Sequence, residues 1–239
     1  MTIDVLGSGS SGNCYLLNAA NETLIIEAGI RFADIKKALN FSFANVVGVV
    51  VSHRHGDHAK SVGDFLNFGI NVYSNADVCS LFKSHFVHQI DHLKAVKIGG
   101  FKVVALSAIH DVPCLAFVIQ HEEFGKLLFM TDSVSFDYSI CGLDHIMIEA
   151  NYEDSILEDN IQRGIEPVSM RGRLLQSHCE LHNALNVVKA QQCIGDIQSL
   201  ILVHLSSRNS NPEEFKAAAE KETGIPTTIA TNGTHIDLL

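Results

Sequence analysis

The segment Ser52-His53-Arg54-His55-Gly56-Asp57-His58 constrains this chain more than any other part of its sequence. It places three imidazoles and a carboxylate within six positions, directly after a nearly unbroken valine run that suits a buried strand. Residues two apart in an extended segment point the same way, so His53 and His55 can bind one metal ion. A turn at Gly56 would direct Asp57 and His58 toward a second ion. Imidazole and carboxylate ligands together suit zinc, manganese or iron.

The rest of the chain is long and apolar enough to build a folded body around such a site. It has 239 residues, 46% of them hydrophobic, and 4 prolines. No Pro/Gly/Ser-rich stretch or charge run marks a linker, so we expect one domain over residues 1–239. We find no secretion signal and no apolar run long enough to span a membrane. The scattered cysteines are typical of reduced thiols, and together these features favour a cytoplasmic protein without a membrane partner. They are Cys14, Cys79, Cys114, Cys141, Cys179 and Cys193.

Hydrophobic patterning predicts an α/β chain in which sheet and helix are followed by a second sheet and more helices. We expect strands of a first sheet at residues 2–6, 14–17, 23–27 and 46–52, with a helix at 31–39. We expect an antiparallel second sheet from residues 95–98, 101–106, 115–120 and 126–130. Helical patterning follows at 153–163 and 181–192. Asn211, Pro212 and Glu214 predict the capped start of a last helix that reaches Thr223.

The motif H-x-H-x-D-H at residues 53–58 resembles the signature of the metallo-β-lactamase superfamily. Further segments are similar to the WalJ/YycJ-like exonuclease branch of that superfamily, and they extend the resemblance along nearly the whole chain. These segments are residues 5–14, 109–111, 130–132, 148–151 and 203–206. The resemblance implies an α/β fold of the α+β type, a four-layer αββα sandwich with metals at the sheet edges.

The resemblance also implies two divalent metal ions, zinc or manganese, and a complete set of ligands. His110 matches the third-motif histidine of the first metal, Asp132 the carboxylate between both metals, and His204 the last ligand of the second. The predicted ligands are His53, His55, Asp57, His58, His110, Asp132 and His204. The family usually has aspartate where this chain has Glu27, a position expected to support the metal loop rather than bind an ion.

A modified form of the branch's G-H-L-S-N motif is found at residues 177–183, which read Ser-His-Cys-Glu-Leu-His-Asn. In related phosphodiesterases a histidine in this region contacts the substrate phosphate or protonates the leaving oxygen, often near a glutamate such as Glu149. His178 is the preferred match, and because two residues are inserted, His182 is the alternative. An exposed helix start with two incidental histidines would also account for this segment. The predicted catalytic residues are thus Asp57, His178 and Glu149.

The function implied is hydrolysis of phosphodiesters by a metal-bridging hydroxide, in a DNA exonuclease acting on single-stranded DNA or a duplex end. The net charge of −10 argues against a broad nucleic-acid surface. We therefore expect that a narrow groove binds the nucleic acid in spite of the acidic net charge. The main candidates for substrate contacts in this groove are Arg171, Arg173 and His182. Other basic residues for such a groove are Arg54, Lys60 and Arg208. Two alternatives stay open, a phosphodiesterase for cyclic nucleotides and a non-catalytic metal-bound scaffold.

Overall fold

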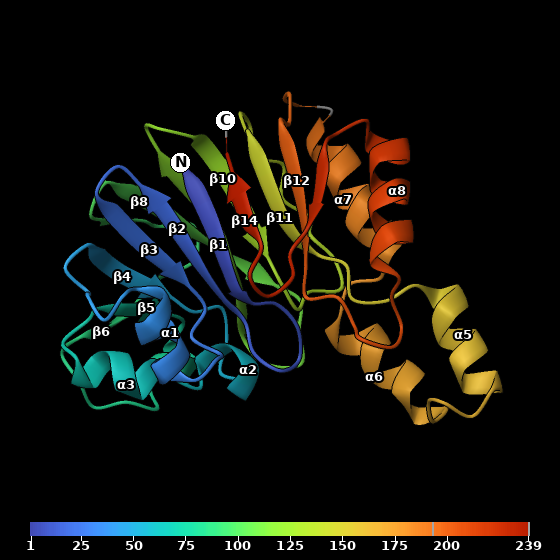
Figure 1. The fold of residues 1–239 in the computed structure, drawn as a ribbon, viewed down its shortest axis with the longest axis horizontal. Helices are drawn as coiled ribbons and strands as arrows, with labels where there is room; N and C mark the ends of the chain where they lie inside the picture. The colour runs from blue at the N-terminus through green and yellow to red at the C-terminus, as the bar shows by residue number, and fades with distance from the viewer. Residues whose placement is uncertain (193, 239) are drawn as a thin grey trace.

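The computed structural model describes residues 1–192 and 194–238, so Cys193 lies outside the described residues. Two seven-stranded sheets face each other, and helices cover their outer faces (Figure 1). This arrangement confirms the expected four-layer αββα sandwich. The expectation of one domain over the whole chain stays a prediction.

The first sheet combines an antiparallel half with a parallel half. Its strand order is β14-β1-β2-β3-β4-β5-β6, and the pairing changes from antiparallel to parallel between β3 and β4. The parallel strand β4 is a valine run because it is covered on both faces. The strands are β1 (Thr2–Gly7), β2 (Cys14–Ala19), β3 (Glu22–Ile26), β4 (Val46–Val50), β5 (Val72–Ser74), β6 (Val87–Gln89) and β14 (His235–Asp237).

The second sheet repeats this division in the order β13-β12-β11-β10-β9-β8-β7. The four runs at residues 95–130 pair antiparallel, as expected. The sheet continues beyond them through parallel strands, so it is mixed and not purely antiparallel. Its strands are β7 (Ala95–Ile98), β8 (Phe101–Ala108), β9 (Cys114–His121), β10 (Gly125–Met130), β11 (His145–Glu149), β12 (Ser199–Val203) and β13 (Thr227–Ile229).

The core fills the space between the sheets and extends under the helices on both sides. Tyr15 and Phe129 meet edge to face at 5.6 Å between ring centroids, one from each sheet. The helices on the first sheet are α1 (Phe32–Ala38), α2 (Gly56–Ala59), α3 (Val62–Asn67) and α4 (Ala76–Cys79). The later helices are α5 (Asp154–Gln162), α6 (Ser169–Ser177), α7 (Leu181–Gln192) and α8 (Pro212–Thr223). Figure 1 shows α7 and α8 packed along the second sheet, while α5 and α6 lie below them.

The last helix follows the expected local rules. The side chain of Asn211 caps α8 by accepting from the Glu214 N–H, and Pro212 occupies the first turn. Gly224 ends the helix in the left-handed conformation, with φ of 70°. Local capping chemistry therefore sets both ends of α8.

One edge of the sandwich collects the loops that follow β3, β4, β10, β11 and β12. Parallel strands end at the same side of a sheet, so their following residues meet there. At three of these ends a non-glycine residue takes a positive φ, namely Glu27 (66°), Asp132 (49°) and His204 (56°). Such backbone conformations cost about 1–3 kcal/mol each and tend to occur at functional sites.

Candidate metal centre and active site

The first group of potential ligands contains His53, His55 and His110. Nδ1 of His55 lies 3.1 Å from Nε2 of His53 and 3.2 Å from Nε2 of His110. All three can place a ligand atom within 4.8 Å of one another. His55 is the N-cap of the short helix α2, which starts at Gly56, so the expected turn at Gly56 is the first turn of a helix.

The second group contains Asp57, His58 and His204, again with ligand atoms within 4.8 Å of one another. Oδ2 of Asp57 is 3.6 Å from Nε2 of both His58 and His204. Helix α2 carries Asp57 and His58, whereas His204 directly follows β12 of the opposite sheet. The group therefore joins the two halves of the sandwich.

Asp132 lies between these groups and contacts both. Its Oδ2 is 3.4 Å from Nε2 of His53 and 2.7 Å from Nε2 of His58. The hydroxyl of Ser133 accepts from the Ile109 N–H at 3.0 Å and donates to the Ser135 carbonyl at 2.8 Å. Ser133 thereby fixes the turn after Asp132 against the loop that carries His110.

These side chains are suited to divalent cations by their chemistry. Their donors are imidazole nitrogens and carboxylate oxygens, which is the ligand set of zinc and manganese sites. Within residues 1–192 and 194–238, the buried Nε2 of His204 has no hydrogen-bond partner. A buried nitrogen without a partner costs free energy, and a metal ligand bond would remove that cost. The residues present thus fit bound metal.

The protonation of the two groups differs. Burial and the neighbouring His58 lower the pKa of His53, and burial lowers the pKa of His110, so these rings stay neutral and ready to bind metal. Burial also acts to lower the pKa of His58, but the charges of Asp132 and Glu27 outweigh it and raise that pKa to about 10. A metal ion must therefore displace protons at the second group.

Two residues outside the ligand set hold the loop of residues 52–58 in place. Buried Glu27 accepts from the Ser52 N–H at 3.3 Å, and its Oε1 lies 3.5 Å from Nδ1 of His58. Asn13 was not identified from the sequence, although it directly follows a glycine-rich loop. Its Nδ2 donates to the Asp57 carbonyl at 3.1 Å and lies 3.1 Å from Nε2 of His58.

The structure brings His178 and Glu149 to the same edge. Nδ1 of His178 lies 2.7 Å from Oε1 of Glu149 and 3.2 Å from Oδ1 of Asp132. Burial acts to lower the pKa of His178, but the charge of Glu149, the contact with Asp132 and the hydrogen bond to Glu149 raise it to about 9. Because Nδ1 faces carboxylates, Nε2 is the ring nitrogen left for a substrate.

His182 does not reach this cluster. Its side chain is 56% exposed, and its Nδ1 lies 3.3 Å from Oε1 of Glu222 on α8. His178 is the extended residue after α6, whereas His182 sits in the first turn of α7, so the two rings diverge.

The two candidate arginines of α6 also separate. Arg171 faces α5, where its Nη1 lies 2.8 Å from Oε2 of Glu158. Arg173 lines a pocket beside His178 and His204. The structure therefore places Arg173, and not Arg171, next to the cluster.

Comparison with known proteins identifies the class to which this fold and site belong. A model of the metallo-beta-lactamase superfamily matches residues 7–140, more than half of the chain. The chain therefore belongs to the metallo-β-lactamase superfamily, and it is a metal-dependent hydrolase.

Two of the relatives that match this chain in sequence are named exodeoxyribonucleases. The chain is 22% identical over 227 residues to the exodeoxyribonuclease WalJ of Streptococcus pneumoniae, covering 87% of this chain and 83% of that protein. It is 24% identical over 227 residues to the exodeoxyribonuclease YycJ of Bacillus anthracis, covering 87% and 84% respectively. The crystal structure of the metallo-beta-lactamase fold protein YhfI from Bacillus subtilis has the same fold, with a TM-score of 0.76 at 18% identity over 98% of each chain. Within the described part of this chain, no helix is long and apolar enough to cross a membrane.

Proposed function

We propose that this protein hydrolyses phosphodiester bonds of nucleic acid with two divalent metal ions, and that it acts as a DNA exonuclease. The observation that carries the proposal is the position of Asp132. Its Oδ2 lies 2.7 Å from Nε2 of His58, and its Oδ1 lies 3.2 Å from Nδ1 of His178. One carboxylate thus connects the ligand groups to a histidine that can transfer a proton. The two relatives named exodeoxyribonuclease support a DNA substrate.

The ligands divide between the two ions as the geometry groups them. His53, His55 and His110 would hold one ion, the group of Asp57, His58 and His204 the other, and Asp132 would contact both. Zinc or manganese bound there lowers the pKa of a water molecule and stabilises negative charge on the phosphoryl oxygens.

The remaining steps belong to the side chains. Asp57 is 26% exposed and can accept a hydrogen bond from the attacking water, which orients it toward phosphorus. Glu149 holds His178 through Nδ1, so that Nε2 can donate a proton to the departing alkoxide. The buried amide of Asn151 donates to the His204 carbonyl at 2.9 Å and keeps the loop of His204 in place.

A phosphodiesterase for cyclic nucleotides is the second candidate. The pocket beside His178 has a volume of about 350 Å³, which lies in the range of pockets for small ligands. The net charge of −10 also disfavours a long polyanion. The same metal chemistry would serve either substrate.

The test is hydrolysis by protein loaded separately with zinc or manganese. Single-stranded DNA, duplex DNA, RNA, cyclic nucleotides and bis(p-nitrophenyl) phosphate are compared, with Asp57→Ala as the inactive control. Release of mononucleotides from DNA that the control lacks is the expected result. Opening of cyclic nucleotides without DNA cleavage would favour the second candidate, and metal binding without any hydrolysis would indicate a scaffold.

A further inference from the structure

A pocket of about 350 Å³ lies beside His178 and His204, between α6 and the loop that follows β12. Arg173, Arg208, Ser206 and Ser207 contribute polar groups to its lining, and Leu174 and Met170 contribute apolar ones. Because His178 belongs to the same lining, a ligand in this pocket adjoins the reaction centre.

The charge of the pocket differs from that of the whole chain. Arg173 has no ion pair among the described residues, and the side chain of Arg208 is 64% exposed. Among the described residues that line the pocket, the one carboxylate is that of the buried Glu166, whose Oε1 lies 3.6 Å from Nη1 of Arg208. On a chain with a net charge of −10, this pocket is a place with more arginine than carboxylate.

The backbone of Arg208 is fixed although its side chain is exposed. Asn160 of α5 donates to the Arg208 carbonyl at 2.8 Å and to Oδ1 of Asn209 at 2.9 Å. The hydroxyl oxygen of Ser206 accepts from the N–H groups of Arg208 at 3.4 Å and Asn209 at 3.2 Å. A guanidinium on a fixed backbone loses less conformational entropy when it binds a ligand.

We propose that this pocket binds the terminal phosphate monoester of the substrate strand, with Arg173 and Arg208 pairing with its oxygens. The inference rests on the proposed nuclease function. A terminal monoester carries nearly two negative charges and three free oxygens, whereas an internal diester carries one charge and two such oxygens. Two arginines with neighbouring hydroxyls match the monoester, since arginine binds phosphate oxygens through parallel N–H donors.

The location of the pocket explains why binding of a terminal phosphate would favour cleavage near the end of the strand. A volume of about 350 Å³ lies at the small end of the range for ligand pockets, which favours one terminal group over a run of nucleotides. A strand whose terminal phosphate occupies the pocket therefore presents a bond close to its end to His178. Glu166 competes with the terminal phosphate for Arg208, so it weakens binding of the phosphorylated end.

The experiment compares otherwise identical oligodeoxynucleotides that carry a 5′-phosphate, a 3′-phosphate or hydroxyls at both ends. The quantity measured is the ratio of kcat/KM for each phosphorylated strand to that of the hydroxyl strand. We expect a ratio of about tenfold or more for one of the two phosphates, equivalent to one charge-assisted hydrogen bond. Arg173→Gln and Arg208→Gln are expected to bring it close to unity, and Glu166→Gln to raise it.

The ratio is taken within each variant, so partial loss of folded protein does not change it. Arg163→Gln is the matched control, because Arg163 is an exposed arginine at the C-cap of neighbouring α5 that pairs with Asp159. Equal cleavage of all three strands by the wild type, or an unchanged ratio in Arg173→Gln, would overturn the terminal-phosphate proposal alone. Hydrolysis of bis(p-nitrophenyl) phosphate without cleavage of any strand would instead overturn the nuclease function.

Discussion

Nδ1 of His178 lies 2.7 Å from Oε1 of Glu149, and the second oxygen of that carboxylate accepts from the Cys179 N–H at 3.2 Å. The buried glutamate thus fixes both the ring and the backbone that carries it. This relationship gives His178 one free nitrogen at the reaction centre, which is the requirement for a proton donor.

Replacing His178 tests that role through the leaving group. For His178→Gln we expect DNA cleavage to slow by about 10²–10⁴-fold, because the alkoxide then leaves without a proton. Hydrolysis of bis(p-nitrophenyl) phosphate should slow far less, since nitrophenolate leaves unprotonated. His182→Gln removes the alternative histidine, and steady-state rates on both substrates should stay near those of the wild type. Equal losses on both substrates would speak against proton donation by His178.

Replacing Gly29 tests the packing of the loop that carries Asp57. A Cβ at residue 29 would lie 1.6 Å from the Asp57 carbonyl oxygen, so Gly29→Ala must displace that backbone. We expect a loss of about 1–3 kcal/mol in the free energy of unfolding, measured by urea denaturation, and weaker metal binding without loss of any ligand. Gly56→Ala is the control from the same loop, since a Cβ there meets no atom within 4 Å. Similar behaviour of both variants would contradict this packing argument.

The division of the ligands into two groups predicts how the metal content changes when a ligand is replaced. By elemental analysis of the purified protein, we expect about two ions per chain in the wild type and about one in His110→Ala or His204→Ala. Asp132→Ala should lose both, because Asp132 contacts both groups. Asp64→Ala, a substitution on the exposed side of α3, should keep the full content. Retention of two ions in Asp132→Ala would exclude a shared ligand at this position.

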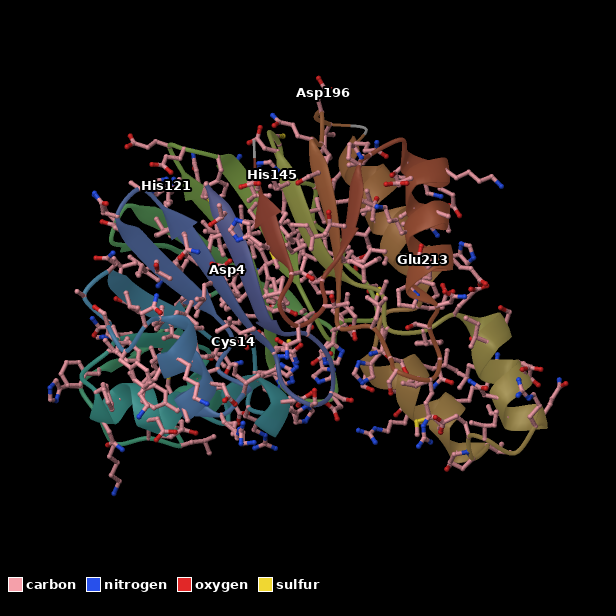
Figure 2. All side chains as sticks on the ribbon, viewed as in Figure 1. Asp4, Cys14, His121, His145, Asp196 and Glu213 are labelled. Atoms are coloured by element: carbon pink, nitrogen blue, oxygen red, sulfur yellow. The ribbon has the colours of Figure 1, made fainter. Side chains whose placement is uncertain are left out.

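His145 predicts a dependence of stability on pH that is separate from the metal centre. His145 is the first residue of β11, and Figure 2 labels it in the upper part of the sandwich. Burial lowers its pKa below the ordinary value of 6.5, although Asp144 opposes this. The unfolded chain therefore takes up the proton first, and the contribution of His145 is present above pH 6.5 and lost as pH falls below it.

Urea denaturation between pH 7.5 and pH 5.5 would measure this effect. The free energy of unfolding of the wild type should fall by up to about 1.4 kcal/mol more per pH unit than that of His145→Gln. His182→Gln, which changes an exposed histidine, should retain the wild-type slope. A parallel pH dependence of wild type and His145→Gln would refute the prediction.

Part of the secondary structure could be predicted from local patterns, including the strands β4 and β10 that lead into the site. The capped helix α8 and the helix α7 lie where the sequence indicated them. Helix α6 was not predicted, because Gly172 and the polar residues around it interrupt the apolar spacing. The parallel pairing of β10, β11 and β12 was also missed, since it joins segments that are distant in the chain.

By itself the sequence pointed to the seven potential ligands, through the H-x-H-x-D-H motif and the resemblance to the metallo-β-lactamase superfamily, and their binding of metal stays a prediction. Only the tertiary structure decided which further residues join them. It directs His178 inward and His182 toward α8, and it separates Arg173 from the ion-paired Arg171. Those outcomes depend on the angle between α6 and α7 and on the packing of α5 against α6. Such relationships arise from contacts between different helices and strands. A local sequence pattern contains only the spacing of residues within a single helix or strand.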